Sequence, residues 1–238
     1  MLKFLKDLIS PKRCYWCWSE WYFLCEDCFD EIEKHYYFDE MCYVCKWFSR
    51  NFEVHEECKN NVFYDKVIIM SHYKIKVIKK LIKYFKFYGR KDIVYDFGEY
   101  ISNKIIKNMK DELSKYKKDD FIVVFPPMNL FRKLKRWYNH SEVLAKIISL
   151  NLWFNYEKNI ILRNRQTRQQ SKLNKQERLH NLDEAFKINK KKKDIIDNKI
   201  IILVDDVVST WTTVNELSKI LKEHNPLKIV IVTIASWF

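Results

Sequence analysis

The sequence predicts an α/β protein in which a parallel-sheet domain, residues 63–238, follows a small cysteine-rich module, residues 1–62. Apolar stretches of strand length alternate with amphipathic stretches of helix length, as in a parallel sheet with helices on both faces. One apolar stretch, Ile201–Val204, has no polar alternation, as expected for a strand that is buried on both faces. The module is predicted from the cysteines, which all precede residue 62.

Four paired-ligand spacings, three Cys-x-x-Cys and one His-x-x-Cys, account for all 7 cysteines of the chain. An odd number of cysteines does not suit a closed disulfide framework, whereas such pairs bind tetrahedral zinc through thiolates and an imidazole. The spacing therefore predicts two structural zinc sites. Their candidate ligands are Cys14, Cys17, Cys25, Cys28, Cys42, Cys45, His55 and Cys58.

A sequential grouping is expected, with the first four ligands on one ion and the last four on the other. A cross-braced grouping is the alternative, and spacing alone does not exclude it. Either arrangement fills all four coordination positions with protein ligands, which is typical of structural rather than catalytic zinc. Metal binding would then supply most of the folding free energy of this module.

The elements of the sheet domain follow in order. Helical periodicity at 75–88 places apolar residues on one face and lysines mostly on the other. Packing on the sheet with solvated lysines is favoured there over binding to a membrane or nucleic acid. The remaining pattern predicts strands at 65–73, 121–125, 160–162, 185–188 and 228–235, and helices at 91–116 and 141–150.

The stretch Lys199–Leu221 organises the rest of the chain. Its buried strand leads into the carboxylate pair Asp205 and Asp206, then into a loop of hydroxyl residues, and then into an amphipathic helix. Backbone N–H groups and hydroxyls at a helix N-terminus suit a phosphate, and carboxylates accept hydrogen bonds from sugar hydroxyls. The alternative is a buried strand followed by a helix with Ser and Thr caps, which occurs in any α/β protein.

Composition and charge indicate where the protein is expected to act and what kind of partner suits it. No apolar run reaches the roughly 18 residues of a membrane span, and Lys3, Lys6 and Asp7 interrupt the apolar N-terminus, so we expect a cytoplasmic protein. The net charge of +13, from 44 basic and 31 acidic residues, favours a polyanionic partner. The Lys-rich and Arg-poor composition is also what an AT-rich coding sequence produces.

The Cys-x-x-Cys pairs and five stretches of the chain resemble the ComF family (ComFC and GntX proteins), which joins a zinc module to a type I phosphoribosyltransferase-like domain. The resemblance covers nearly the whole chain in the family's order. The matching stretches are FKFYGRKDI (85–93), VVFPP (123–127), RWYNHSEVLAK (136–146), TRQQSKLNKQERLHNLDEAFKI (167–188) and ILVDDVVSTWTT (202–213).

The resemblance implies a pocket for phosphoribosyl pyrophosphate (PRPP), in which Asp205 and Asp206, as the catalytic pair, hold the ribose hydroxyls. The loop after them would hold the 5′-phosphate, the turn at 127–129 would face the pyrophosphate with Mg²⁺ bridging its oxygens, and three arginines would close over the leaving group. A solvated loop is the alternative for the arginines. The implied PRPP-binding residues are Ser209, Thr210, Trp211, Thr212, Thr213, Pro127, Met128, Asn129, Arg163, Arg165 and Arg168.

One departure from the family concerns glycine. The chain has 2 Gly and 8 Trp, whereas average usage would give roughly 17 Gly. Trp137 and Trp211 stand where the family has Gly, and Trp18 directly follows a Cys-x-x-Cys pair, where Gly is common. We hypothesise that these tryptophans mark a codon that the organism decodes as Gly. The alternative is a degenerate homologue whose phosphate site is filled by Trp211.

The resemblance implies a role in DNA uptake during natural transformation, with single-stranded DNA as a partner and PRPP or a related sugar phosphate as the ligand. Positive charge and abundant aromatic residues suit single-stranded DNA. A phosphoribosyltransferase of nucleotide metabolism with an unknown acceptor is the alternative, and an inactive zinc-stabilised scaffold is a third possibility. No residue stands out as a general base or as a reader of an acceptor.

Overall fold

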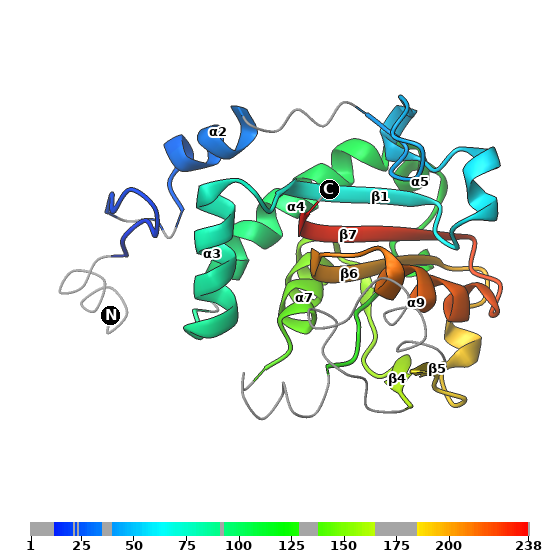
Figure 1. Cartoon of the computed structure of the whole chain (residues 1–238). Coiled ribbons are helices and arrows are strands. Elements are labelled where there is room, and N and C mark those ends of the chain that lie inside the picture. The colour runs from blue at the N-terminus through cyan, green and yellow to red at the C-terminus, as the bar shows by residue number, and fades with distance from the viewer. Residues whose placement is uncertain are drawn as a thin grey trace.

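A five-stranded sheet in the order β1-β7-β6-β2-β3 forms the centre of the computed structural model, and every neighbouring pair is parallel (Figure 1). The structure describes residues 12–20, 22, 24–34, 40–90, 93–128, 138–164 and 185–237. The predicted α/β class with a parallel sheet is confirmed. The strands are β1 (Lys66–His72), β2 (Phe121–Val124), β3 (Asn155–Tyr156), β6 (Ile200–Val208) and β7 (Lys228–Ser236).

Two hydrophobic clusters lie on the two faces of the sheet. Along β6, Ile200, Ile202 and Val204 belong to one cluster, and Ile201 and Leu203 belong to the other. This alternation follows from the period of two in a strand, and it explains why the run is apolar throughout. Helices α3 (Lys76–Phe87), α4 (Ile93–Asn108) and α7 (His140–Leu152) cover the first face, and α9 (Thr212–Lys222) with the antiparallel pair β4 (Ile161–Arg163) and β5 (Phe186–Ile188) covers the second.

The two cysteine segments contribute to different clusters. The first segment, residues 12–34, contains α2 (Glu26–Lys34) and joins the cluster on the α3 face through Cys14, Cys25 and Cys28. The second segment, residues 40–60, contains the short turns η1 (Arg50–Phe52) and η2 (Glu56–Asn60) and joins the cluster on the α9 face. Each segment therefore completes the core on one side of the sheet.

The single helix that the periodicity predicts at 91–116 is broken into α4 and α5 (Lys110–Lys115) at Met109, which has φ −125° and ψ 30°. The carbonyl of Asn108 accepts a hydrogen bond from Lys66 Nζ at 2.9 Å. The donor to this carbonyl thus lies on β1, far away in the sequence. Helical periodicity cannot predict such a contact.

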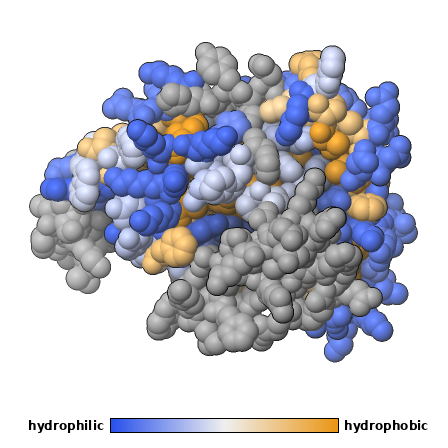
Figure 2. All heavy atoms as spheres, viewed as in Figure 1, coloured by the Kyte–Doolittle hydropathy of each residue, from blue (hydrophilic) through white to orange (hydrophobic). Residues whose placement is uncertain are grey.

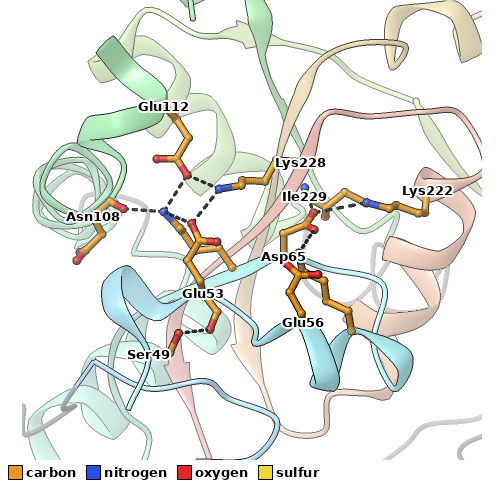
Figure 3. A network of polar contacts seen from close by, with 11 residues as sticks. Ser49, Glu53, Glu56, Asp65, Asn108, Glu112, Lys222, Lys228 and Ile229 are labelled. Atoms are coloured by element: carbon orange, nitrogen blue, oxygen red, sulfur yellow. Dashed lines mark hydrogen bonds and ion pairs between the residues drawn. The ribbon is translucent and has the colours of Figure 1, made fainter. Parts of the chain in front are cut away.

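A network of charged side chains lies at the amino ends of β1 and β7 (Figure 3). Lys66 is 1% exposed, and its ammonium lies 2.9 Å from Glu112 and 3.2 Å from Glu53. Lys228 contacts the same two carboxylates at 2.7 and 2.9 Å. Although burial opposes ionisation, the two lysines hold the pKa of Glu112 below its ordinary value. The network ties the second cysteine segment to the sheet and to α5.

Among the residues that carry a hydropathy colour in Figure 2, hydrophilic ones predominate and hydrophobic ones form separate patches. Within the described ranges, the helices include none with the length and hydropathy that crossing a bilayer requires.

We predict that Lys66→Ala lowers the free energy of unfolding by about 3 kcal/mol, because the substitution leaves the buried Glu112 with one ammonium instead of two. Urea denaturation followed by circular dichroism measures the change. Lys110→Ala, on an exposed position of α5, is the matched control and should change stability by less than about 0.5 kcal/mol. Equal effects of the two substitutions would contradict a stabilising role for the network.

Candidate functional site

The candidate site lies where neighbouring strands of the sheet lead in opposite directions. From β2 the chain passes through α7 to β3, and from β6 it passes through α9 to β7, on the other side in the strand order. Since α7 and α9 cover opposite faces, the carboxyl ends of β2 and β6 flank a topological switch point. Parallel α/β sheets bind their ligands at such points.

Asp205 and Asp206 lie at this position, but not after the strand as predicted. Strand β6 continues through them to Val208, because β7 pairs with it as far as Val208↔Ser236. On the other side β2 ends at Val124, opposite Leu203, so the acid pair faces the space beyond β2. Main-chain pairing with β7, through Asp205↔Thr233 and Val207↔Ala235, therefore holds the backbone on both sides of Asp206, and among the described residues β2 does not pair with the acids on the other edge.

The side-chain alternation of β6 slips at the acid pair. Val204 and Val207 both pack against the cluster on the α3 face, although residues three apart in a regular strand point to opposite faces. The carboxylates accept hydrogen bonds from the next backbone amides, Asp206 N to Asp205 at 2.9 Å and Val207 N to Asp206 at 2.6 Å. The slip allows groups on one face to reach both acids.

Three residues that the sequence analysis did not select hold the acid pair. Ser141 Oγ, in the first turn of α7, donates to Asp205 at 2.8 Å. Lys86 Nζ, in the last turn of α3, lies 2.9 Å from Asp206, and both side chains are largely buried. The buried His140 packs between Phe85 and Tyr138 and its field acts on Asp206.

These residues belong to stretches that the sequence analysis quoted, FKFYGRKDI and RWYNHSEVLAK, without assigning them a role. The lysine and the serine within these stretches were the features of the sequence from which a role at the acid pair could have been predicted. Tyr138 OH also donates to the carbonyl of Phe85 at 2.6 Å, and Asn139 donates to the carbonyl of Pro126 at 2.9 Å. The start of α7 is thereby fastened to the end of α3 and to the chain just beyond β2.

The two carboxyl groups differ in acidity. Burial and the adjacent charge of Asp206 raise the pKa of Asp205 to about 6, although Ser141 and Lys86 counteract them. Burial also opposes ionisation of Asp206, but Lys86 and His140 hold the pKa of that carboxyl below its usual range. At neutral pH both acids are ionised beside one ammonium. Such a pair can accept hydrogen bonds from two neighbouring hydroxyls.

The predicted phosphate loop connects β6 to α9. Ser209 and Thr210 follow the strand, Trp211 occupies the N-cap position of α9, and Thr212 and Thr213 form its first turn. The Thr210 hydroxyl oxygen is buried and has no hydrogen-bond partner among the described residues. The backbone amides of a helix start and a hydroxyl of this kind suit an anion.

Trp211 is the one residue of this loop that does not suit the binding of a phosphate. Its indole lies against Tyr43, with ring centroids 5.5 Å apart, and against Tyr64 at 6.0 Å. The indole therefore fills the space between the loop and the second cysteine segment. A glycine at this position would let a phosphate approach the main chain closely, which an indole prevents.

The other predicted ligand-binding residues are only partly described. Pro127 and Met128 follow β2 at the carboxyl edge and are half-buried. Arg163 lies on β4, and its guanidinium stacks 4.9 Å from the ring centre of Phe186 on β5. Their roles toward a ligand stay predictions. Asn129, Arg165 and Arg168 lie outside the described residues.

The cysteines form two groups that can each hold a metal ion. Cys14, Cys17, Cys25 and Cys28 form one group, and Cys42, Cys45, His55 and Cys58 form the other, with ligand atoms within 4.8 Å of one another in each. This is the sequential grouping rather than the cross-braced one. Thiolates and an imidazole fit zinc. Hydrogen bonds to Ser19 lower the pKa of Cys17 to about 6, whereas burial raises the pKa of Cys28.

We predict that ¹³C NMR of the aspartate carboxyls shows Asp205 titrating near pH 6 and Asp206 below its ordinary range. Lys86→Met removes the nearest cation, so it will raise both pKa values. Lys83→Met, at an exposed position on the same helix, will leave them unchanged. An Asp205 that titrates near 4, or curves insensitive to Lys86→Met, would show that the acids are not coupled in this way.

Comparisons with known proteins agree with this geometry. A family model described as the phosphoribosyl transferase domain matches residues 139–236, which include the start of α7 and the loop after β6. Competence protein F of Haemophilus influenzae is 28% identical over 166 residues, covering 69% of this chain and 70% of the relative.

Competence protein ComFC of Streptococcus pneumoniae is 28% identical over 203 residues, covering 84% of this chain and 81% of the relative. DNA utilization protein YhgH of Escherichia coli K12 is 29% identical over 109 residues, 46% of each chain. Residues 139–236 thus match the phosphoribosyl transferase domain, two cysteine groups that can each hold a metal ion precede them, and the resemblance of the chain to the ComF competence proteins is confirmed.

Proposed function

We propose that this protein binds PRPP or a related sugar phosphate and acts in DNA uptake together with single-stranded DNA. The observation that carries the ligand is the acid pair at the switch point, held by Lys86 and Ser141 beside a loop with a buried, unpartnered Thr210 hydroxyl. Asp205 and Asp206 bind the ribose hydroxyls, and the loop binds the 5′-phosphate. Mg²⁺ accompanies the pyrophosphate group.

The role in DNA uptake is supported by the names of the relatives, which are competence and DNA utilization proteins. The net charge of +13 suits a polyanion. Exposed aromatic residues suit the stacking of unpaired bases, as at Phe48 in the second cysteine segment and Tyr95 in α4. Together these features favour a protein that handles single-stranded DNA over an enzyme defined by one small acceptor.

The first test is calorimetric titration with PRPP in the presence of Mg²⁺. Replacing both Asp205 and Asp206 by Asn removes charge-assisted hydrogen bonds, and affinity should fall by about 100-fold. Replacing the exposed Asp194 and Asp197 by Asn is the control of equal charge and should change affinity little. If neither this chain nor its Trp211→Gly variant binds PRPP, the proposed ligand is wrong.

The same variants separate the two roles. Binding of single-stranded DNA should weaken steeply with salt and survive replacement of the acid pair. Release of pyrophosphate from PRPP, dependent on an added acceptor and abolished in the acid variant, would instead favour a phosphoribosyltransferase. Absence of DNA binding at low salt would contradict the uptake role.

We also propose that zinc fills both cysteine groups and acts structurally. Metal analysis of the purified chain should find about two zinc ions, and Cys14→Ser or Cys58→Ser should each leave about one. Each substitution should also lower the thermal midpoint, because each group packs into the core on one face of the sheet. Two bound ions in either variant would show that the grouping is different.

A further inference from the structure

We infer that the positions read as tryptophan carry glycine in the protein as the cell makes it, and that glycine at 211 opens the loop to the phosphate of a sugar phosphate. The first part stands on backbone conformation, exposure and composition. The second part rests on the proposed function. The two parts can therefore fail separately.

Backbone conformation gives the first observation. A positive φ is unfavourable for residues with a large side chain, whereas Gly adopts it freely and Asn tolerates it. Of the nine positive-φ positions among the described residues, five carry one of these two types and two carry tryptophan, namely Trp18 at 68° and Trp153 at 59°. The other two are Lys46 and Phe52, and Phe52, unlike the two tryptophans, is buried in the core. The Gly and Asn positions are Gly89, Asn51, Asn159, Asn198 and Asn225.

Trp153 occupies the position that ends a helix with glycine. It follows α7 with φ 59° and ψ 37°, and its amide donates to the carbonyl of Ser149. The amide of Phe154 donates to the same carbonyl at 3.1 Å. A left-handed residue of this kind is usually Gly because it has no Cβ to clash. The indole is 82% exposed, so packing does little to offset the unfavourable conformation.

Trp18 also has a left-handed backbone, and it directly follows the first Cys-x-x-Cys pair. Its amide donates to the carbonyl of Cys14 at 2.9 Å as the turn closes behind Cys17. Lys46 has the same place in the second cysteine segment, with φ 67° and an amide bond to Cys42 at 2.8 Å. The turn itself therefore imposes the left-handed backbone. The Trp18 side chain is 64% exposed, so its packing does little to offset the unfavourable backbone conformation.

Exposure gives the second observation. Of the six tryptophans in the described part of the chain, four are exposed and two are half-buried, although an indole normally buries a large apolar area. The exposed ones are Trp18, Trp47, Trp153 and Trp237, and the half-buried ones are Trp16 and Trp211.

Composition gives the third observation, because the 2 glycines that remain lie where other residues fit poorly. Gly89 has φ 67°, and a Cβ on Gly98 would lie 2.3 Å from Ile147 Cγ2. One codon read as Trp in this sequence and as Gly in the cell explains the glycine deficit, the exposed indoles and the two strained turns together.

Residue 211 links this inference to the site. Glycine at 211 would remove the indole that contacts the rings of Tyr43 and Tyr64, and the residue before it, Thr210, has a buried hydroxyl without a hydrogen-bond partner among the described residues. Glycine also exposes the backbone amides at the start of α9. The ligand class is a phosphate monoester, as in the 5′-phosphate of a phosphorylated ribose.

The identity of these residues is tested directly by the gene and by the native protein. We expect UGA, a codon whose meaning differs between genetic codes, at all eight positions, and peptide mass spectrometry of the protein from its source should read glycine at 18, 153 and 211. UGG codons, or peptides that contain tryptophan at these positions, would overturn the inference whatever the protein binds.

Variants of the printed chain test the physical consequences. Trp153→Gly should raise the midpoint of thermal unfolding by relieving the left-handed turn, whereas Leu150→Gly, at an exposed site within α7, should lower it. Trp211→Gly should raise the affinity for PRPP at least 10-fold, and Trp153→Gly should leave that affinity unchanged. A lower midpoint for Trp153→Gly would contradict the strain at that turn.

Glycine found at 211 in the native protein, together with no PRPP binding by the Trp211→Gly variant, would confirm the residue identity and refute the proposed ligand. Tryptophan found at 211, together with PRPP binding by the chain with tryptophan, would refute the residue identity and support the proposed ligand. The two results distinguish the inference from the function on which its second part rests.

Discussion

Two adjacent carboxylates can stay ionised in a partly buried strand only if other groups compensate for them, and this requirement shapes the site. Asp205 and Asp206 repel each other, and burial adds to the cost of their charges. Lys86 and Ser141 supply the compensation from one face of the sheet, and β7 fixes the main chain from its edge. The slip in alternation along β6 makes both acids accessible to that one face.

Charge is thus divided between the two ends of the sheet. At the amino ends of β1 and β7, Lys66 and Lys228 are paired with Glu53 and Glu112, so the charges at that end neutralise one another. At the carboxyl end of β6, two acids share the ammonium of Lys86, so negative charge remains available to accept hydrogen bonds. The first arrangement is structural, and the second can serve a ligand.

Much of this was predictable from local pattern. The run Ile201–Val204 indicated a doubly buried strand, the acids and hydroxyls after it indicated the loop, and the cysteine spacing indicated the two groups. What the sequence could not report were contacts between distant segments. Lys86 and Ser141 reach the acids from α3 and α7, and β7 extends β6 beyond Val204. In the same way, Lys66 donates to the carbonyl of Asn108 at the break between α4 and α5, which periodicity did not predict.

The distribution of the cysteine segments over both faces bears on how far the chain can be shortened. A fragment beginning at residue 63 would keep every strand of the sheet, yet it would uncover apolar surface on both sides at once, where Cys14 and Cys28 pack on one and Tyr43 and Val54 on the other. It would also remove Glu53 from the side of Lys66. The cysteine segments and the sheet domain therefore share their hydrophobic clusters, and a fragment without these segments would expose apolar surface that favours aggregation.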